Sequence, residues 1–325
     1  MKRPGGIHRV RRFAAGVAIL IIQGSCIAPA AERPATLPAK SATKPTPTAT
    51  APAKPTAPPA TAANQRLLTQ TGFRLAGPMI QGGTVIGSVP AGTTLLSFNG
   101  APLPMTADGR FLIAFDRDAP ASATLSAKLE DGRQIDEMLT VAKRAWNIER
   151  LNSLPRFAQP SEEFDRLRPA ELEQINAARQ ISVNSAGWQQ QFLWPVVGRL
   201  SGMFGSQRIY KNGEAGSYHS GSDVAQPTGT PVIAPADGVV ILAADHPFTL
   251  EGNLLMIDHG MGLNSAFLHL SRIDVRVGET IKRGQRIGAV GMTGRATGPH
   301  LHWSLKWHNS RIDPLLLAGP MPVVQ

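Results

Sequence analysis

The sequence predicts a mainly β protein with an antiparallel C-terminal domain, and two observations support this fold class. Short apolar runs recur along the chain, which is typical of strands. Glycine, often directly after Asp or Asn, separates these runs in the way that hairpin turns require. One segment, residues 161–180, has helical spacing instead. We therefore expect β domains joined by a helical connector.

The first 30 residues have the pattern of an export leader. Arg9, Arg11 and Arg12 directly precede an apolar run at residues 13–22, which is shorter than the about 20 residues that span a bilayer. The leader ends either at Ala-Pro-Ala, residues 28–30, which is similar to a cleavage site, or at Gly-Ser-Cys, residues 24–26, which is similar to the end of a bacterial lipobox. The expected location is the periplasm or cell envelope, with membrane anchoring through a lipidated Cys26 as the alternative.

Residues 31–63 are rich in Pro, Ala and Thr and contain scattered lysines. Such a composition has little apolar surface to bury and is expected to stay extended or disordered. We interpret this segment as a tether between the leader and a folded body.

The net charge of +10 is unevenly distributed. Eight of these charges lie in the first 63 residues, so residues 64–325 carry only +2. A nearly neutral body lacks the basic surface that binds nucleic acid backbones, so nucleic acid is not an expected partner. Cys26 is the single cysteine, which excludes an internal disulfide and a thiolate metal site in the folded body.

Residues 64–145 are predicted to form a small β domain. Its stretch at residues 111–115, Phe-Leu-Ile-Ala-Phe, favours a strand. The domain has no acid–base cluster and no metal-ligand spacing, which indicates a structural or binding role. Its turn signals are Gly82-Gly83, Asn99-Gly100, Asp108-Gly109 and Asp131-Gly132.

Residues 146–190 are predicted to be a helical connector. Pro169 suits a first helical turn, and Leu172, Ile175 and Arg179 follow at helical spacing. Acids come early in the segment and Arg179 comes late, as the helix dipole favours.

Residues 191–318 are predicted to form a second, antiparallel β domain. Apolar runs at residues 232–234 and 239–242 flank Asp237-Gly238. A third run, residues 254–257, leads into Asp-His-Gly, where His259 is expected to be a turn residue.

Three histidine-containing stretches of this domain could together form a zinc site. His219 and Asp223 lie four residues apart, and His300 and His302 would share one face of a strand because strand side chains alternate. A hydrolytic zinc site uses about three protein ligands and one open position. His219, Asp223 and one of the two strand histidines supply that number. The other strand histidine, with His269, would then move protons or stabilise an oxyanion.

The same domain resembles the M23 (lysostaphin/LytM-type) zinc metallopeptidases from about residue 194 to residue 314. The resemblance depends on motifs that occur in the family's order. They are FGSQR at 204–208, HSGSD at 219–223, GTPVIAPADGVV at 229–240, GNLLMIDHGMGLNSAFLHLS at 252–271, VGETIKRGQRIGAVGMTGRATGPHLHWSL at 277–305, and Asp313-Pro314.

The resemblance implies one catalytic zinc ion per chain on an antiparallel sheet with a groove. It implies that His219, Asp223 and His302 are the zinc ligands, and that His300 and His269 are catalytic histidines beside the metal. Arg208 and Asn253 match family positions near the groove. Arg208 would either pair with a substrate carboxylate or brace a loop.

Two positions depart from the family pattern. Members often carry a tyrosine two residues before the histidine of the HLS stretch, where this chain has Phe267 at the expected edge of the substrate site. Members also often carry an acidic residue soon after the final histidine, where this chain has Trp303 and Ser304. Neither position is a ligand, so the departures concern substrate preference and rate.

The resemblance implies a zinc endopeptidase that cuts peptide cross-links of bacterial peptidoglycan. Two alternatives belong to other classes. Some family members have lost zinc ligands and activate cell-wall amidases, and this chain retains all of the corresponding residues. The small β domain would instead be the active part in a carbohydrate-binding or scaffolding protein of the envelope.

Overall fold

The computed structural model describes residues 66–153 and 161–322. The predicted leader, the tether and the lipidated Cys26 lie outside the described residues. None of the helices within the described ranges combines the length and the apolar character needed to cross a membrane.

Residues 66–140 form two four-stranded antiparallel sheets. The first has the order β1-β2-β3-β6 and the second has the order β5-β4-β7-β8. Side chains alternate along β7, so that Ala123, Leu125, Ala127 and Leu129 point into the core. The strands are β1 (Arg66–Leu68), β2 (Arg74–Ala76), β3 (Thr84–Ser88), β4 (Thr93–Phe98), β5 (Ala101–Pro102), β6 (Arg110–Ala114), β7 (Ser122–Leu129) and β8 (Gln134–Thr140).

Helix α1 (Glu162–Arg179) occupies the segment with helical spacing. Ser161 caps it, because its hydroxyl accepts a hydrogen bond from the backbone nitrogen of Phe164. The prediction that Pro169 lies in the first turn is wrong, since Pro169 is inside the helix. The cap at Ser161, followed by three acids in the first turn, starts the helix two turns earlier.

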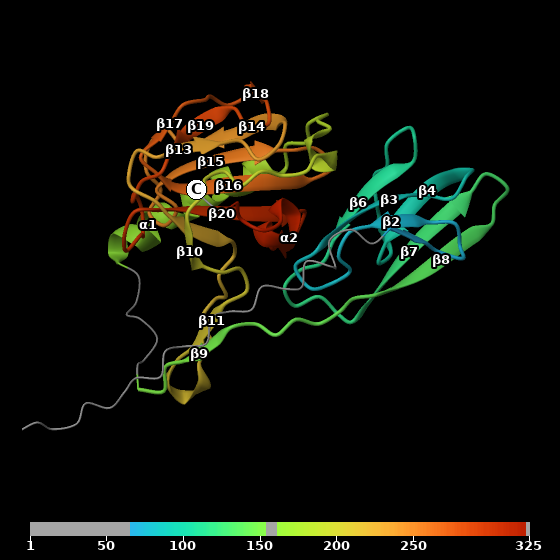
Figure 1. The fold of residues 1–325 in the computed structure, drawn as a ribbon, viewed down its shortest axis with the longest axis horizontal. Helices are drawn as coiled ribbons and strands as arrows, with labels where there is room; N and C mark the ends of the chain where they lie inside the picture. The colour runs from blue at the N-terminus through green and yellow to red at the C-terminus, as the bar shows by residue number, and fades with distance from the viewer. Residues whose placement is uncertain (1–65, 154–160, 323–325) are drawn as a thin grey trace, which may run out of the picture. The chain divides into compact units, whose positions relative to one another are not determined.

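The C-terminal domain is built on an eight-stranded antiparallel sheet of order β10-β12-β20-β16-β15-β14-β18, with β21 paired to β20. Figure 1 shows β14, β15, β16 and β20 lying side by side. The strands are β10 (Arg199–Gly202), β12 (Ser222–Ala225), β14 (Gly238–Ala243), β15 (Asn253–Asp258), β16 (Leu263–Leu270), β18 (Thr280–Ile281), β20 (His300–Trp307) and β21 (Ser310–Ile312).

Smaller elements complete the described chain. A three-stranded antiparallel sheet has the order β13-β19-β17, and a short parallel pair joins β9 to β11. Their bounds are β9 (Ile148–Arg150), β11 (Gln207–Ile209), β13 (Pro231–Ile233), β17 (Arg272–Ile273), β19 (Arg286–Ala289) and α2 (Pro314–Ala318), with short 3₁₀ helices at Gly187–Gln189 and Lys211–Gly213. The prediction of a mainly β fold with an antiparallel C-terminal sheet is confirmed.

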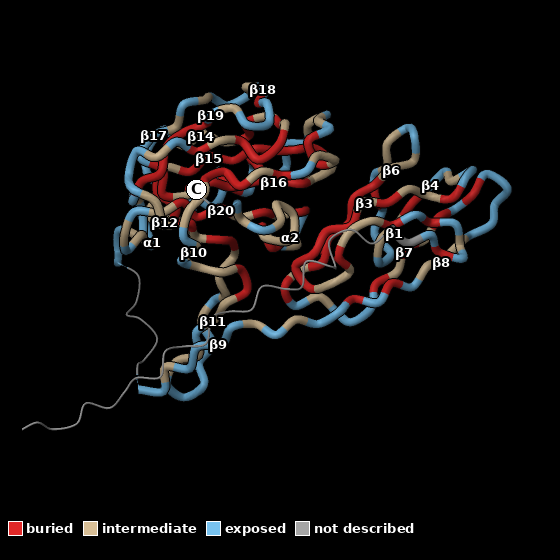
Figure 2. The backbone as a smooth tube through the Cα atoms, in the orientation of Figure 1, coloured by how far each residue is buried: buried red, intermediate tan, exposed pale blue. Residues whose placement is uncertain are grey.

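The eight-stranded sheet has two different faces. On one face Leu301, Trp303 and Leu305 of β20 are fully buried in the main core. On the other face, Ile175 and Ala178 of α1 pack against apolar side chains of β14, β15 and β16. Figure 2 shows the central strands β15 and β16 as buried. Helix α1 thus covers part of the second face, which is the face of β20 that carries His300 and His302.

A buried polar chain lies within the main core directly behind β20. His259 was expected to be a turn residue, but its side chain is fully buried. Its Nδ1 lies 2.8 Å from the carbonyl oxygen of Asp237, and its Nε2 lies 2.8 Å from Ser265 Oγ. Trp303 Nε1 donates to the same hydroxyl oxygen at 3.2 Å. All of these groups are satisfied when the imidazole is neutral, with its proton on Nδ1.

Acid is expected to destabilise the fold through His259. Burial lowers the pKa of His259 to about 4 from the 6.5 that is normal for histidine. As the pH falls from 6.5 towards 4, His259 therefore binds a proton in the unfolded chain but stays neutral in the folded chain. The stability contributed by the neutral imidazole is complete above pH 6.5 and declines through this window, by roughly 3 kcal/mol in all.

Urea unfolding at pH 7, 5.5 and 4.5 measures this effect by comparing the wild type with His259→Gln. The wild type should lose more free energy of unfolding than the variant across the series, while His246→Gln, at an exposed histidine, should follow the wild type. Parallel curves for the wild type and His259→Gln would contradict the assignment.

Candidate metal and catalytic site

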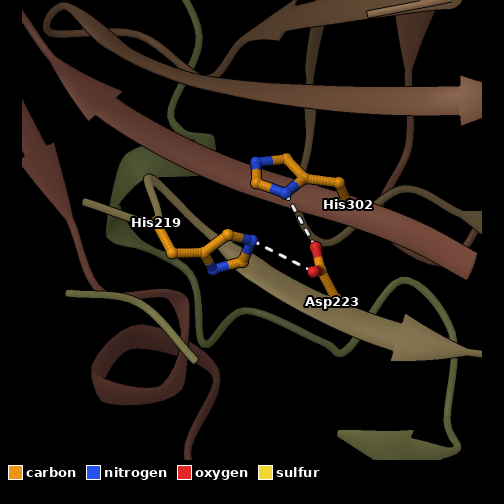
Figure 3. Close-up of side chains that lie close together, drawn as sticks. All are labelled: His219, Asp223 and His302. Atoms are coloured by element: carbon orange, nitrogen blue, oxygen red, sulfur yellow. Dashed lines mark hydrogen bonds and ion pairs between the residues drawn. The ribbon is translucent and has the colours of Figure 1, made fainter. Parts of the chain in front are cut away.

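Three predicted metal ligands converge from two neighbouring strands and the loop before them. Asp223 on β12 is the direct cross-strand partner of His302 on β20. His219 lies in the loop that leads into β12, four residues before Asp223. Figure 3 shows both imidazole rings pointing at the carboxylate of Asp223. One potential ligand atom from each residue lies within 4.8 Å of the other two.

The carboxylate of Asp223 links the two imidazoles. Its Oδ1 lies 2.8 Å from His302 Nδ1, and its Oδ2 lies 3.1 Å from His219 Nε2. Burial alone would raise the pKa of the Asp223 carboxyl, but the hydrogen bonds from His219 and His302 outweigh burial and hold the pKa far below its usual range. Asp223 is therefore ionised at every pH of interest.

Burial also sets the two histidines apart. The side chain of His302 is 9% exposed, and burial lowers its pKa despite the hydrogen bond to Asp223. The side chain of His219 is 25% exposed. Burial acts to lower its pKa, but the hydrogen bond to Asp223 and the negative charge of Asp223, together with backbone contacts, outweigh burial and raise the pKa. The three side chains thus form one carboxylate hydrogen-bonded to two imidazoles in a partly buried space.

This donor set fits a zinc ion. His219 Nδ1 lies 3.2 Å from the carbonyl oxygen of Met203, which fixes the ring and leaves Nε2 as the donor atom toward Asp223. A backbone carbonyl on the outer nitrogen is the usual support of a metal-binding histidine. Two imidazoles and one carboxylate, with room for a further ligand, are typical of hydrolytic zinc sites. No other group of His, Cys, Asp and Glu within the described ranges has such a geometry.

Two glycines allow the ligands to pack this closely. A Cβ atom on Gly202 of β10 would lie 2.3 Å from Asp223 Oδ2 and 3.0 Å from His219 Cε1. A Cβ atom on Gly221 would lie 2.9 Å from His302 Nε2 and 2.3 Å from the carbonyl oxygen of Trp303. Any larger residue at either position must displace a ligand or the strand that carries it.

Gly202→Ala is expected to weaken zinc binding by about 10- to 100-fold, as changes beside metal ligands commonly do. The added methyl group would push the carboxylate of Asp223 out of line with both imidazoles. Competition with a chromogenic zinc chelator measures the affinity, and circular dichroism checks the fold. Gly298→Ala is the matched control, because a Cβ atom there meets open space. Equal zinc affinity in both variants would show that Gly202 does not shape the site.

The remaining two histidines lie beside this triad. His300 shares the β20 face of His302, and its Nε2 is 3.9 Å from Asp223 Oδ1. His300 Nδ1 lies 2.8 Å from the carbonyl oxygen of Gly298, which leaves Nε2 directed to the site. The rings of His269 and His300 are 4.8 Å apart, and those of His269 and His302 are 6.3 Å apart. The structure thus brings all five predicted ligands and catalytic histidines together.

His269 reaches the site through an unusual backbone conformation. Its φ is 63°, in the left-handed region that non-glycine residues rarely adopt. Its Nδ1 lies 2.9 Å from the carbonyl oxygen of Thr293, and its backbone nitrogen donates to the carbonyl of Glu251 at 2.8 Å. Burial lowers the pKa of His269 to about 4, and repulsion by His300 and His302 adds to this. The imidazole is therefore neutral at neutral pH, with Nδ1 bonded to Thr293 and Nε2 able to accept a proton.

Helix α1 supports the loop that holds His269. Arg168 binds the carboxylate of Glu251 with both terminal nitrogens, and the Nη2–Oε1 distance is 2.8 Å. Glu171 accepts hydrogen bonds from the backbone nitrogen and the hydroxyl of Thr249, both at 2.6 Å. These buried contacts fix residues 249–251 to the helix. Through the carbonyl of Glu251, they reach the backbone of His269.

The three residues predicted near the substrate have different placements. The Asn253 amide donates to the carbonyl of Leu270 at 2.9 Å, so it braces the turn at His269. Arg208 forms an ion pair with Glu149, with Nε and Oε2 2.8 Å apart, which corresponds to the alternative that Arg208 braces a loop. Phe267 is fully buried opposite Trp303, on the core face of the sheet, so its prediction as part of the substrate site is wrong. The left-handed residue His269 interrupts the strand alternation that would otherwise place 267 and 269 on one face.

Sequence reasoning missed several residues that shape the site. Gly221 lies inside the HSGSD motif, which is a weak signal of its role, whereas Gly202 lies outside every quoted motif. Thr293, Arg168 and Glu251 act through contacts between distant segments, and their local sequence carries no signal of this role.

The segment that carries these residues is similar to known proteins. Residues 217–314 match the profile of Peptidase family M23. A segment of 123 residues is 45% identical to the peptidoglycan DD-endopeptidase ShyA of Vibrio cholerae, covering 38% of this chain and 28% of that protein. A segment of 127 residues is 38% identical to the DD-carboxypeptidase/endopeptidase Mpg of Neisseria meningitidis, covering 39% of this chain and 29% of that protein. The match therefore spans less than a third of the length of either relative.

The wider fold is also similar to a solved structure. A putative peptidase M23 from Pseudomonas aeruginosa superimposes with a TM-score of 0.57 at 29% sequence identity. The similarity covers 74% of this chain and 95% of that one, so it extends well beyond residues 217–314.

Proposed function

We propose that this protein, whose residues 217–314 match the profile of peptidase family M23, is a zinc-dependent endopeptidase that hydrolyses peptide cross-links of bacterial peptidoglycan. The observation that carries the proposal is the assembly of His219, Asp223 and His302 beside two further histidines. The names of the relatives from Vibrio and Neisseria support peptidoglycan as the substrate. A substrate in the cell wall requires export, in keeping with the predicted leader.

The roles of the residues follow from their chemistry. His219, Asp223 and His302 would hold zinc, which supplies an acidified water molecule and polarises the peptide carbonyl. Neutral His269 would accept a proton at Nε2 and pass it to the leaving amine. The Nδ1 of His300 donates to the carbonyl of Gly298, so a proton taken up at its Nε2 would let His300 donate a hydrogen bond to the oxyanion that develops on the carbonyl.

The retained ligand set does not favour the alternative of a non-catalytic amidase activator. Such a regulator would have no need of His219, Asp223 and His302 converging within reach of one metal ion, with two further histidines beside them.

Mass spectrometry of muropeptides tests the proposed function. Bacterial sacculi are incubated with the purified chain, with and without zinc and with a chelator. We expect cross-linked dimers to disappear only in the zinc-loaded sample, and the products identify the bond that is cut. If zinc binds but the sacculi stay unchanged, the enzyme proposal is wrong and a regulatory role gains weight.

A further inference from the structure

The metal-binding face of β20 continues past His302 to a cation. Because strand side chains alternate, His300, His302, Ser304 and Lys306 share one face, while Leu305 between them is fully buried on the other. Lys306 lies four residues beyond His302, or about 13 Å along the strand. An extended peptide that lies along β20 and is cleaved at the metal site would therefore place next to Lys306 a group that is three to four residues from the cleaved bond.

Two arginines join Lys306 in what we call the cation cluster: Arg179, Lys306 and Arg311. Arg311 on β21 is the direct cross-strand partner of Lys306. Arg179 is the last residue of α1, the helix that covers the neighbouring strands on this face. Burial lowers the pKa of the Lys306 ammonium group, and the charges of Arg179 and then Arg311 lower it further. The three cations are close enough to repel one another.

The cation cluster is short of anions. The Nε atom of Arg179 is buried and has no hydrogen-bond partner in the described part of the chain. The ion pairs formed among the described residues include neither Arg179 nor Lys306. Glu251 acts on Arg179 through its charge, but its carboxylate is bound by Arg168. Partly buried cations without a partner are costly, and an incoming anion would remove that cost.

One carboxylate already lies at the edge of the cation cluster. Asp116 accepts a hydrogen bond from the backbone nitrogen of Arg311 at 2.8 Å and from the hydroxyl of Tyr218 at 3.3 Å. The guanidinium of Arg311 lies over the ring of Tyr218, the residue before His219. A carboxylate thus lies beside the backbone of the cluster, near the metal ligands, without forming an ion pair with its cationic side chains. The charge of Asp116 is also felt by Lys306, but it is a single negative charge beside three positive ones, and it forms no ion pair with Arg179 or Lys306 among the described residues.

We propose that Arg179 and Lys306 bind a carboxylate of the peptide substrate, on the face of β20 that leads away from the metal site. This inference rests on the proposed function, because it assumes that the substrate is a peptide held along β20. It makes the protein selective for acidic peptides, with a free carboxylate three to four residues from the bond that is cut.

A binding measurement tests the proposal without catalysis. The full chain is freed of zinc, so that no metal binds carboxylates, and is titrated with a purified cross-linked muropeptide dimer. The same dimer with its carboxyl groups converted to amides serves as the comparison. We expect the acidic dimer to bind about tenfold more tightly than the amidated dimer, as charge-assisted hydrogen bonds allow. Lys306→Gln and Arg179→Gln should each reduce this preference, whereas Lys128→Gln, an exposed lysine on β7, should retain it.

Kinetics of the zinc-loaded protein provide the second readout. Lys306→Gln should raise the KM for the acidic dimer by about tenfold and leave kcat within about twofold, because Lys306 lies too far from the reacting bond to affect the chemistry. Loss of folding is not expected, since the substitution removes a repelled, half-buried charge.

The outcomes separate this inference from the proposed function. If the wild type cleaves the dimer but both substitutions leave KM and the acidic preference unchanged, the inference is overturned and the enzyme proposal stands. If the wild type cleaves nothing, the enzyme proposal fails, and the binding preference still decides the role of the cation cluster. Equal binding of the acidic and amidated dimers, or no binding of either, overturns the inference.

Discussion

His302→Ala is expected to abolish zinc binding and peptide hydrolysis together. The substitution removes one of three proposed ligands and leaves His219 as the imidazole hydrogen-bonded to Asp223, with His300 Nε2 at 3.9 Å from the same carboxylate. Two protein ligands do not make a stable hydrolytic zinc site. Without the metal, the acidified water and the polarised carbonyl are both lost, so we expect kcat/KM to fall by at least about 1,000-fold. Zinc content per chain after gel filtration and cleavage of purified muropeptide dimers measure the two effects.

An exposed histidine provides the matched control for this substitution. The side chain of His246 is 59% exposed and contacts Asp245, away from the metal ligands. His246→Ala should keep one zinc ion per chain and wild-type hydrolysis. Retention of a full zinc ion by His302→Ala would refute its assignment as a ligand and would direct attention to His300 on the same strand face.

His269→Ala is expected to separate catalysis from metal binding. The ring of His269 lies 6.3 Å from the ring of His302, but His269 is not one of the three residues whose ligand atoms converge. Its neutral imidazole is directed to the site by the bond to Thr293. Losing a positioned proton acceptor typically slows catalysis by about 100- to 10,000-fold, and we expect a fall in kcat of this order with zinc content unchanged.

The same two assays read out the result. A large fall in kcat with a full zinc ion supports a role in proton transfer. Loss of zinc together with activity would mean that His269 supports the ligands instead, and hydrolysis within tenfold of wild type would mean that it takes no part in the reaction.

Strand alternation explains why part of the site was predictable from sequence. His300 and His302 are two residues apart in β20, and the structure places both on the face of Asp223. Asp223 lies directly opposite His302, so a regular antiparallel pairing suffices to assemble two of the ligands. The turns at Gly109 and Gly132 were also predictable, because each glycine follows an aspartate. In the structure both glycines adopt the positive φ angles that glycine tolerates best.

Other features depend on contacts that no local pattern contains. Alternation alone would turn His269 toward the core, and its φ of 63° reverses this, held by Thr293 and Glu251 from distant segments. The same reversal explains why Phe267 is buried rather than beside the substrate. His259 had the sequence of a turn residue, but tertiary packing against Phe192 and Ser265 makes it part of the core.

The attachment of α1 to residues 249–251 means that the segment supporting the candidate site begins well before the family match. The family match begins at residue 217, whereas the helix that holds the backbone beside His269 ends at residue 179. A graft of the matched segment alone would carry every ligand and catalytic histidine but would leave Glu251 without Arg168 and Thr249 without Glu171. A chimeric protein that carries this segment should therefore begin before Ser161, so that the contacts of the helix to residues 249–251 are kept.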